Sequence, residues 1–198
     1  MEQFLQAALR EGEYVIWQGT PDPYRLLDAD NKKATLTTWI ISIAIAAGLS
    51  VLYTMYALSG DGSSLQPFVY ILTIGFPFIG FIDPYRDKRH INAQKMAITD
   101  QRVLVFHKST ASENNALEMR LESIDAIRVE EIEPGYSRIC IGSPAFGLKH
   151  SKKRRCAILG VKDDDKITAL ILYRMANSDC AKICSMFQER GVTMDKGQ

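Results

Sequence analysis

Residues 39–58 read WIISIAIAAGLSVLYTMYAL, twenty residues without a charged side chain. The uncharged stretch extends back to Ala34 and forward to Gly60. A helix of about twenty residues covers the roughly 30 Å hydrocarbon core of a bilayer. A surface helix of a soluble protein would show a polar stripe along one side, and this run shows none. The sequence therefore predicts a membrane-spanning helix over residues 35–58.

A second uncharged run, residues 65–82, reads LQPFVYILTIGFPFIGFI. Its eighteen residues are close to the minimum for a span. Pro67 suits the first turn of a helix, and Pro77 predicts a kink of the kind that membrane helices tolerate. The two runs together predict a transmembrane helical hairpin over residues 35–82. The alternative interpretation is a pair of buried core helices in a soluble protein.

The basic residues around these runs indicate an orientation. They are Arg25, Lys32 and Lys33 before the first run, and Arg86, Lys88 and Arg89 after the second. The connecting loop, residues 59–64, contains no Lys or Arg. Since cytoplasmic flanks carry the excess of basic residues, we expect both chain termini to be cytoplasmic.

The first run also carries small residues at helical spacing, in Ala44-x-x-x-Gly48 and Ala46-x-x-x-Ser50. Small side chains let two helix backbones approach closely in a membrane. Contact within the hairpin and contact between copies in a homo-oligomer explain this pattern equally well.

The overall composition hides these features. The chain has 198 residues, 46% of them hydrophobic, with 24 basic and 23 acidic residues and a mean hydropathy of −0.08. These averages exclude a disordered chain, and the charge balance gives no pull toward nucleic acid. Four cysteines are too few for a disulfide scaffold.

Residues 83–198 are patterned mostly with the period of two that is typical of strands. Alternating or apolar segments are expected to form strands around residues 96–98, 103–107, 117–121, 124–129, 138–142, 156–161 and 167–173. The last element differs, because Cys180, Ile183, Cys184 and Phe187 form the stripe of an amphipathic helix. A helix with one apolar stripe must lie across a sheet or plug an open barrel, so the pattern predicts an α+β domain.

Three segments resemble the bacterial PH-like (pleckstrin-homology-like) membrane proteins. They are REGEYVIWQGTPDP (10–23), KMAITDQRVLVFHKS (95–109) and LESIDAIRV (121–129). The matching residues are Gly12, Glu13, Trp17, Gly19 and Pro21, then Ile98, Thr99, Asp100 and Arg102. The resemblance implies a bent antiparallel sheet or open barrel closed by the C-terminal helix, in a protein of the bacterial inner membrane. The expected organisation is a cytoplasmic N-terminal segment (1–34), the transmembrane hairpin (35–82) and a cytoplasmic PH-like domain (83–198).

The sequence offers little for catalysis. His90, His107 and His150 are scattered, and no HExxH, GxSxG or phosphate-binding motif is present. We expect no catalytic residue and no cofactor. Cys140, Cys156, Cys180 and Cys184 form no CxxC pair, so core packing is favoured over a metal site.

The strongest charged feature is Lys149-His-Ser-Lys-Lys-Arg-Arg155. Near an anionic bilayer each base can gain about 1 kcal/mol. The candidate lipid- or partner-binding residues are Lys149, Lys152, Lys153, Arg154 and Arg155, together with Arg86, Lys88 and Arg89. The alternative is a solvated hairpin loop whose bases balance Asp163, Asp164 and Asp165.

These features favour a non-enzymatic membrane protein whose PH-like domain binds a protein partner or anionic lipid. Within the resemblance, a scaffold or an assembly factor of a membrane complex is expected. Two alternatives stay open, a metal- or thiol-dependent redox protein and a subunit of an oligomeric channel or transporter. The second is disfavoured because neither run contains an ionisable residue, which usually marks a transport pathway.

Overall fold

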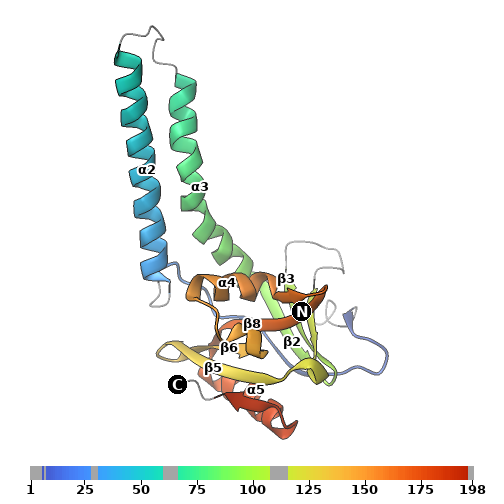
Figure 1. Cartoon of the computed structure of the whole chain (residues 1–198). Helices are drawn as coiled ribbons and strands as arrows, with labels where there is room; N and C mark the ends of the chain where they lie inside the picture. The colour runs from blue at the N-terminus through green and yellow to red at the C-terminus, as the bar shows by residue number, and fades with distance from the viewer. Residues whose placement is uncertain (1–5, 7, 28–30, 60–66, 108–115, 196–198) are drawn as a thin grey trace. The chain divides into compact units, whose positions relative to one another are not determined.

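The computed structural model describes residues 6, 8–27, 31–59, 67–107 and 116–195. The chain divides into two compact units (Figure 1). The α+β unit combines Met1–Arg25 with Asp87–Gln198, and the helical unit is Leu26–Arg86. The segment before the apolar runs therefore folds together with the segment after them.

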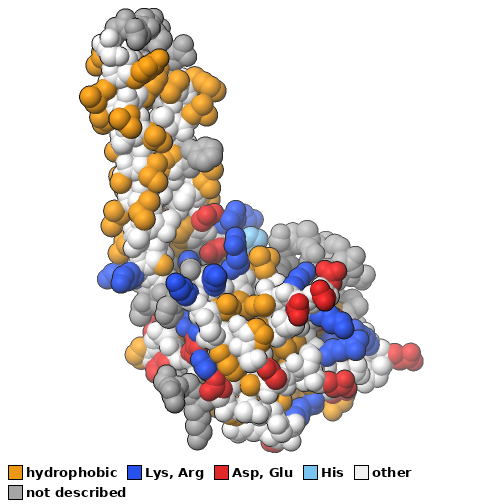
Figure 2. All heavy atoms as spheres, in the orientation of Figure 1, with side chains coloured by type: hydrophobic (Ala, Val, Ile, Leu, Met, Phe, Trp, Pro, Cys, Tyr) orange, Lys and Arg blue, Asp and Glu red, His pale blue; other side chains and the backbone are white. Residues whose placement is uncertain are grey.

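The helical unit contains α2 (Lys32–Leu58) and most of α3 (Pro67–Asn92). Helix α2 is long and apolar enough to cross a membrane, and only 11% of its most apolar stretch is buried. Apolar side chains cover the surfaces of α2 and α3, whereas charged side chains are spread over the α+β unit (Figure 2). The loop expected between the two apolar runs lies outside the described residues.

Helix α3 begins at Pro67, where the sequence predicts a first-turn proline. Its segments Phe68–Gly75 and Pro77–Asn92 are bent by 41° with respect to each other. The kink expected at Pro77 is confirmed, because proline lacks the N–H of the helical hydrogen bond and crowds the preceding turn.

Helices α2 and α3 contact each other through aromatic side chains. Trp39 stacks on Phe81 with ring centroids 5.5 Å apart, and Tyr53 meets Tyr70 edge-on at 5.1 Å. Because the earlier residue of α2 meets the later residue of α3, the two helices run antiparallel within this unit.

The two helices approach each other closely at Gly80 of α3. A Cβ atom there would lie 2.5 Å from the hydroxyl oxygen of Ser42 on α2, so any larger residue would force the Ser42 side chain or the helices to shift. Ala44 and Gly48 are instead exposed. The small face that they form is therefore left uncovered by α3.

The described part of the α+β unit forms two sheets. The first has the order β1-β2-β3-β4, with all neighbours antiparallel, and consists of β1 (Val15–Gly19), β2 (Gln94–Thr99), β3 (Arg102–His107) and β4 (Ala116–Arg120). The second has the order β7-β8-β6-β5-β9 and consists of β5 (Ala126–Glu133), β6 (Tyr136–Ile141), β7 (Val161–Asp163), β8 (Lys166–Ala176) and β9 (Thr193–Asp195). Its neighbours are antiparallel except for the β5–β9 pair. The α+β class is confirmed.

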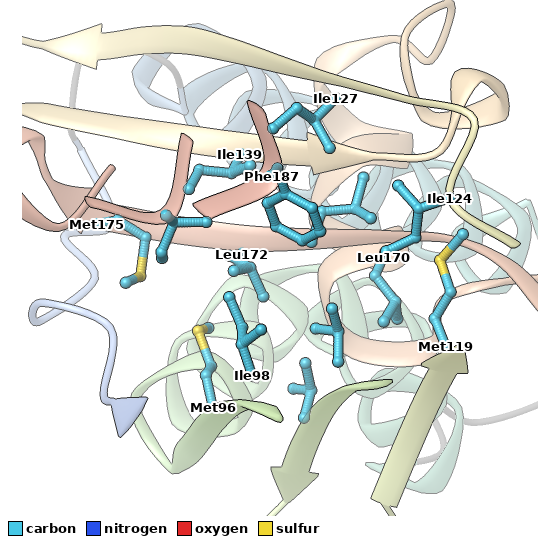
Figure 3. Packing of buried hydrophobic residues seen from close by; sticks show 14 of the residues in the cluster. Met96, Ile98, Met119, Ile124, Ile127, Ile139, Leu170, Leu172, Met175 and Phe187 are labelled. Carbon is cyan, nitrogen blue, oxygen red and sulfur yellow. The ribbon is translucent and has the colours of Figure 1, made fainter. Parts of the chain in front are cut away.

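The core lies between these sheets and is covered by α5 (Asn177–Glu189). Cys180, Ile183 and Phe187 are the buried residues of α5, which confirms the apolar stripe expected there. Figure 3 shows Phe187 among side chains of β5, β6 and β8, including Ile139 and Leu172. Burying side chains of this size contributes roughly 1.5–3 kcal/mol each.

One expected strand is wrong. Residues 156–161 were expected to be a strand after a basic loop, but the segment belongs to α4 (His150–Leu159), and β7 begins only at Val161. The inward face of α4 is formed by Lys153, Cys156 and Ala157. Lys153 obscures the helical period in the sequence, because hydrophobic patterning treats a lysine as a surface residue whereas this one is buried.

Candidate functional site

Three residues on which the resemblance to the PH-like proteins rests, Glu13, Thr99 and Arg102, meet in a buried cluster. Oε1 of Glu13 accepts hydrogen bonds from Nε of Arg102 at 2.9 Å and from the hydroxyl of Thr99 at 2.7 Å. Its Oε2 accepts from Nη2 of Arg102 at 2.8 Å and from the backbone N–H of Arg10 at 2.8 Å. The segment before β1 is therefore fastened to the β2–β3 turn.

The hydrogen bond from Arg102 is the main reason that the pKa of Glu13 falls from 4.5 to about 2. Burial acts in the opposite direction, and the bonds from Arg10 and Thr99 add to the lowering. Glu118 takes a second bond from Arg102. The charged groups of this cluster are paired with one another, so the cluster has a structural role.

The tryptophan and glycine of the same motif have a packing role. Trp17 lies against the main core cluster. A Cβ on Gly19 would lie 2.5 Å from a carbon of the Trp17 ring, so glycine lets the indole fold back over β1. Trp17 and Gly19 therefore contribute to the packing of the α+β unit.

The basic segment 149–155 is divided by α4 into inward and outward bases. Lys153 is buried, and its Nζ lies 2.5 and 2.7 Å from the two carboxylate oxygens of Glu130. Nε of Arg138 donates to the same carboxylate at 2.7 Å. Burial opposes ionisation of Glu130, but the bonds from Lys153 and Arg138 outweigh it, so the pKa of Glu130 is lowered.

Arg154 also points into the structure. Its Nη1 donates to the hydroxyl of Tyr24 at 3.1 Å and lies 3.9 Å from a carboxylate oxygen of Asp87. Tyr24 in turn packs on Tyr173 of β8, with ring centroids 5.8 Å apart. Lys153 and Arg154 thus hold α4 against the rest of the unit.

The remaining bases of the segment, Lys149, Lys152 and Arg155, are exposed. Among the described residues no acidic side chain pairs with any of them. Leu159, near the end of the same helix, is also exposed, at 56%. We call these four residues the outer face of α4.

The three expected bases at the end of α3 behave differently from one another. Arg86 pairs with Asp83 at 3.0 Å on the surface. Arg89 is exposed and Lys88 is half-buried. Hydrophobic patterning of the sequence did not separate the paired bases from the unpaired ones.

A groove that the sequence did not indicate lies between β4 and the β7–β8 hairpin. It has a volume of about 1230 Å³ and is lined by apolar side chains such as Leu117 and Ile167 and by charged ones such as Arg120 and Lys162. In the described part of the chain, β4 and β7 are edge strands. Each therefore presents backbone groups that another strand could pair with.

The four cysteines are free thiols. Burial raises the pKa of Cys140 to about 11 and the pKa of Cys156 and Cys180 to about 12. Cys184 is half-buried, and burial raises its pKa too. Such thiols stay protonated at neutral pH and are poor nucleophiles and metal ligands.

The described residues contain no group of three or more His, Cys, Asp or Glu side chains that could hold a metal ion. Comparison of the chain with protein-family models, curated proteins and solved structures finds no match.

Proposed function

We propose that this chain is a non-enzymatic protein of the bacterial inner membrane. In this proposal a transmembrane hairpin presents a cytoplasmic PH-like domain, which binds a protein partner or anionic lipid as a scaffold or assembly factor. The observation that carries the proposal is the pairing of β1 with β2 across the two apolar helices.

The pairing restricts the membrane topology. Gly19 of β1 lies opposite Met96 of β2, and α2 and α3 lie between them in the sequence. Two strands of one sheet must be on the same side of a membrane. If α2 crosses the bilayer, the chain has to cross back before Met96, and α3 contains the second apolar run. The ladder therefore favours two crossings over one.

The basic flanks favour the cytoplasm for both chain ends. The PH-like assignment is supported by two antiparallel-rich sheets with a C-terminal helix over their core. It is further supported by the structural use of Glu13, Trp17 and Arg102, the residues on which the resemblance rests.

Binding is favoured over catalysis because buried charged groups of the α+β unit are paired with one another. Two of the buried charged clusters, around Glu13 and around Glu130, are occupied by internal ion pairs. The raised thiol pKa values argue against the redox alternative. The exposed face formed by Ala44 and Gly48 is a surface through which copies of the chain can pack. A homo-oligomer of this kind is compatible with a scaffold and with a channel subunit.

The groove beside β4 is the surface that best suits a protein partner. An extended segment could pair with an open strand edge while its side chains enter the apolar lining around Leu117 and Ile167.

The membrane proposal is tested by topology and extraction. Reporter enzymes that act only in the cytoplasm or only outside it are fused to the C-terminus of the full chain. We expect cytoplasmic signal and retention in the membrane after alkaline carbonate washing. A C-terminus outside the cytoplasm, or release by carbonate, would overturn the proposal.

A further inference from the structure

We infer that the outer face of α4 binds the anionic phospholipid headgroups of the membrane that holds the protein. This inference rests on the membrane attachment proposed above and adds a ligand class and a defined surface to it. The residues concerned are Lys149, Lys152, Arg155 and Leu159.

The helix geometry places these residues together. At 3.6 residues per turn, Lys152, Arg155 and Leu159 fall within about 60° of one another around the axis, and Lys149 lies one turn before Lys152. Ala157 is buried on the opposite side of the helix, and Cys156, about 40° from Lys152, is buried at the edge of the exposed stripe. Lys152, Arg155 and Leu159 therefore form one exposed stripe. Lys149, the N-cap residue of α4, adds an exposed base on the far side of Cys156.

Buried contacts of the inward bases fix the orientation of this surface within the α+β unit. Lys153 is bound to Glu130, and Arg154 to Tyr24 and Asp87, so α4 cannot roll without breaking buried ion pairs and hydrogen bonds. A binding surface that is held in place before its ligand arrives loses less entropy on binding.

The charge of the surface calls for an anionic ligand. Its three cations have no acidic partner among the described residues. Glu130 and Asp87 are engaged by the inward bases Lys153 and Arg154. A bilayer containing anionic lipid offers many negative charges in a plane, which suits a row of bases along a helix.

If the second expected span crosses the bilayer, a short stretch of chain ties α4 to it. Asp87, which Arg154 contacts, is five residues beyond Ile82, the end of the second expected span. Five residues cannot extend more than about 18 Å, whatever the arrangement of the two units. The local concentration of lipid headgroups around α4 is therefore high without any further affinity.

Leu159 favours lipid over an acidic protein as the ligand. Leu159 is an exposed apolar side chain beside bases, and such a side chain can enter the boundary of the acyl chains while the bases contact the headgroups. Leu159 also borders the groove beside β4, so the test must separate the two ligands.

The test uses the full chain in lipid nanodiscs. An environment-sensitive fluorophore is attached to L159C in a C184A background, because Cys140, Cys156 and Cys180 are buried. Discs of neutral phosphatidylcholine are compared with discs containing about 30% phosphatidylglycerol. We expect a blue-shifted emission only in the anionic discs, and its loss in about 0.5 M NaCl.

The decisive variant replaces Lys149, Lys152 and Arg155 by glutamine. Each removed base should lower the affinity for anionic discs by about fivefold. The triple variant should therefore bind them about 100-fold more weakly and show no blue shift. The control replaces Lys182 and Arg190, which are exposed bases of the α5 region outside the groove, and should keep it. Circular dichroism confirms that both variants fold.

The remaining outcomes are assigned as follows. An equal shift in neutral discs, or loss of the shift by about 10 mM inorganic phosphate, overturns the lipid assignment. A shift caused by polyglutamate but not by phosphatidylglycerol makes the face a protein-binding surface and also overturns it. Failure of the protein to co-elute with discs defeats the proposed function, whereas co-elution without a shift defeats this inference alone.

Discussion

Glu13 and Arg102 form a two-pronged ion pair across 89 positions of the sequence, with N–O distances of 2.9 and 2.8 Å. The carboxylate side chain is fully buried, and the guanidinium side chain is 7% exposed. The pair joins the segment before the apolar helices to the sheet after them, so it stabilises the pairing of β1 with β2.

Replacing Arg102 by leucine should destabilise the α+β unit by about 3–5 kcal/mol, since it leaves Glu13 charged and buried without its partner. The measurement is urea unfolding of the detergent-solubilised chain, followed by circular dichroism. Adding Glu13→Gln should restore part of the loss. Glu118→Gln is the control, because Glu118 is 43% exposed and its loss should cost within about 1 kcal/mol. An Arg102→Leu chain as stable as wild type would contradict the structural role of the pair.

Stability should fall in acid because of the same residue. The pKa of Glu13 is about 2 in the folded chain and 4.5 as its ordinary value, so its contribution is complete above about pH 5. It is lost as the pH drops from there toward 2, and amounts to on the order of 3 kcal/mol. Unfolding free energies measured between about pH 6 and 3 should show a shallower decline in Glu13→Gln than in wild type. Parallel pH profiles would count against this assignment.

Adjacent lysines on α4 should behave in opposite ways. Lys153→Met leaves Glu130 with one cation fewer in a buried site and should cost about 3 kcal/mol, whereas Lys152→Met should change stability by less than about 0.5 kcal/mol. Thermal unfolding of the two variants compares them directly. Equal losses would mean that α4 does not have the orientation described.

The helix contact at Gly80 predicts a steric effect. Gly80→Val should weaken the packing of α2 on α3 by about 1–3 kcal/mol, because the new Cβ collides with the hydroxyl of Ser42. At Gly75 no described atom lies within 4 Å, so Gly75→Val is a control for the β-branched side chain. Thermal unfolding in detergent should separate the two variants, and Ser42→Ala should partly rescue Gly80→Val. Identical behaviour of the two glycine variants would refute the contact.

Thiol labelling checks the cysteines. In the native chain a water-soluble maleimide should modify Cys184 first and leave Cys140, Cys156 and Cys180 unmodified until denaturant is added. Mass spectrometry of digested protein reads the positions. Rapid native labelling of Cys140 or Cys156 would reopen the redox alternative.

The sequence predicts the elements with a clean period and misses those without one. Helix α5 and strands such as β3 follow their apolar patterns, and the bend at Pro77 follows from the chemistry of proline. Helix α4 was missed because its inward face uses Lys153, whose burial depends on Glu130, a residue of another strand. No local pattern carries that information.

The candidate site shows the same limit. The basic run was visible in the sequence, but the separation of Lys153 and Arg154 from the exposed bases depends on Glu130, Tyr24 and Asp87. The groove beside β4 was invisible, because it is made by edges of two sheets that are far apart in the chain.

The pairing of β1 with β2 has a consequence for biosynthesis. Residues 20–93 must leave the ribosome before β1 can meet its partner, which takes roughly 4–15 s at ordinary rates of translation. During that delay β1 is an unpaired strand that chaperones or misassembly can capture. Completion of the sheet also requires that both strands end in one compartment. If α2 and α3 both insert into the membrane as proposed, a nascent chain whose α3 fails to insert would leave β1 unpaired and exposed to the proteases of the quality-control system.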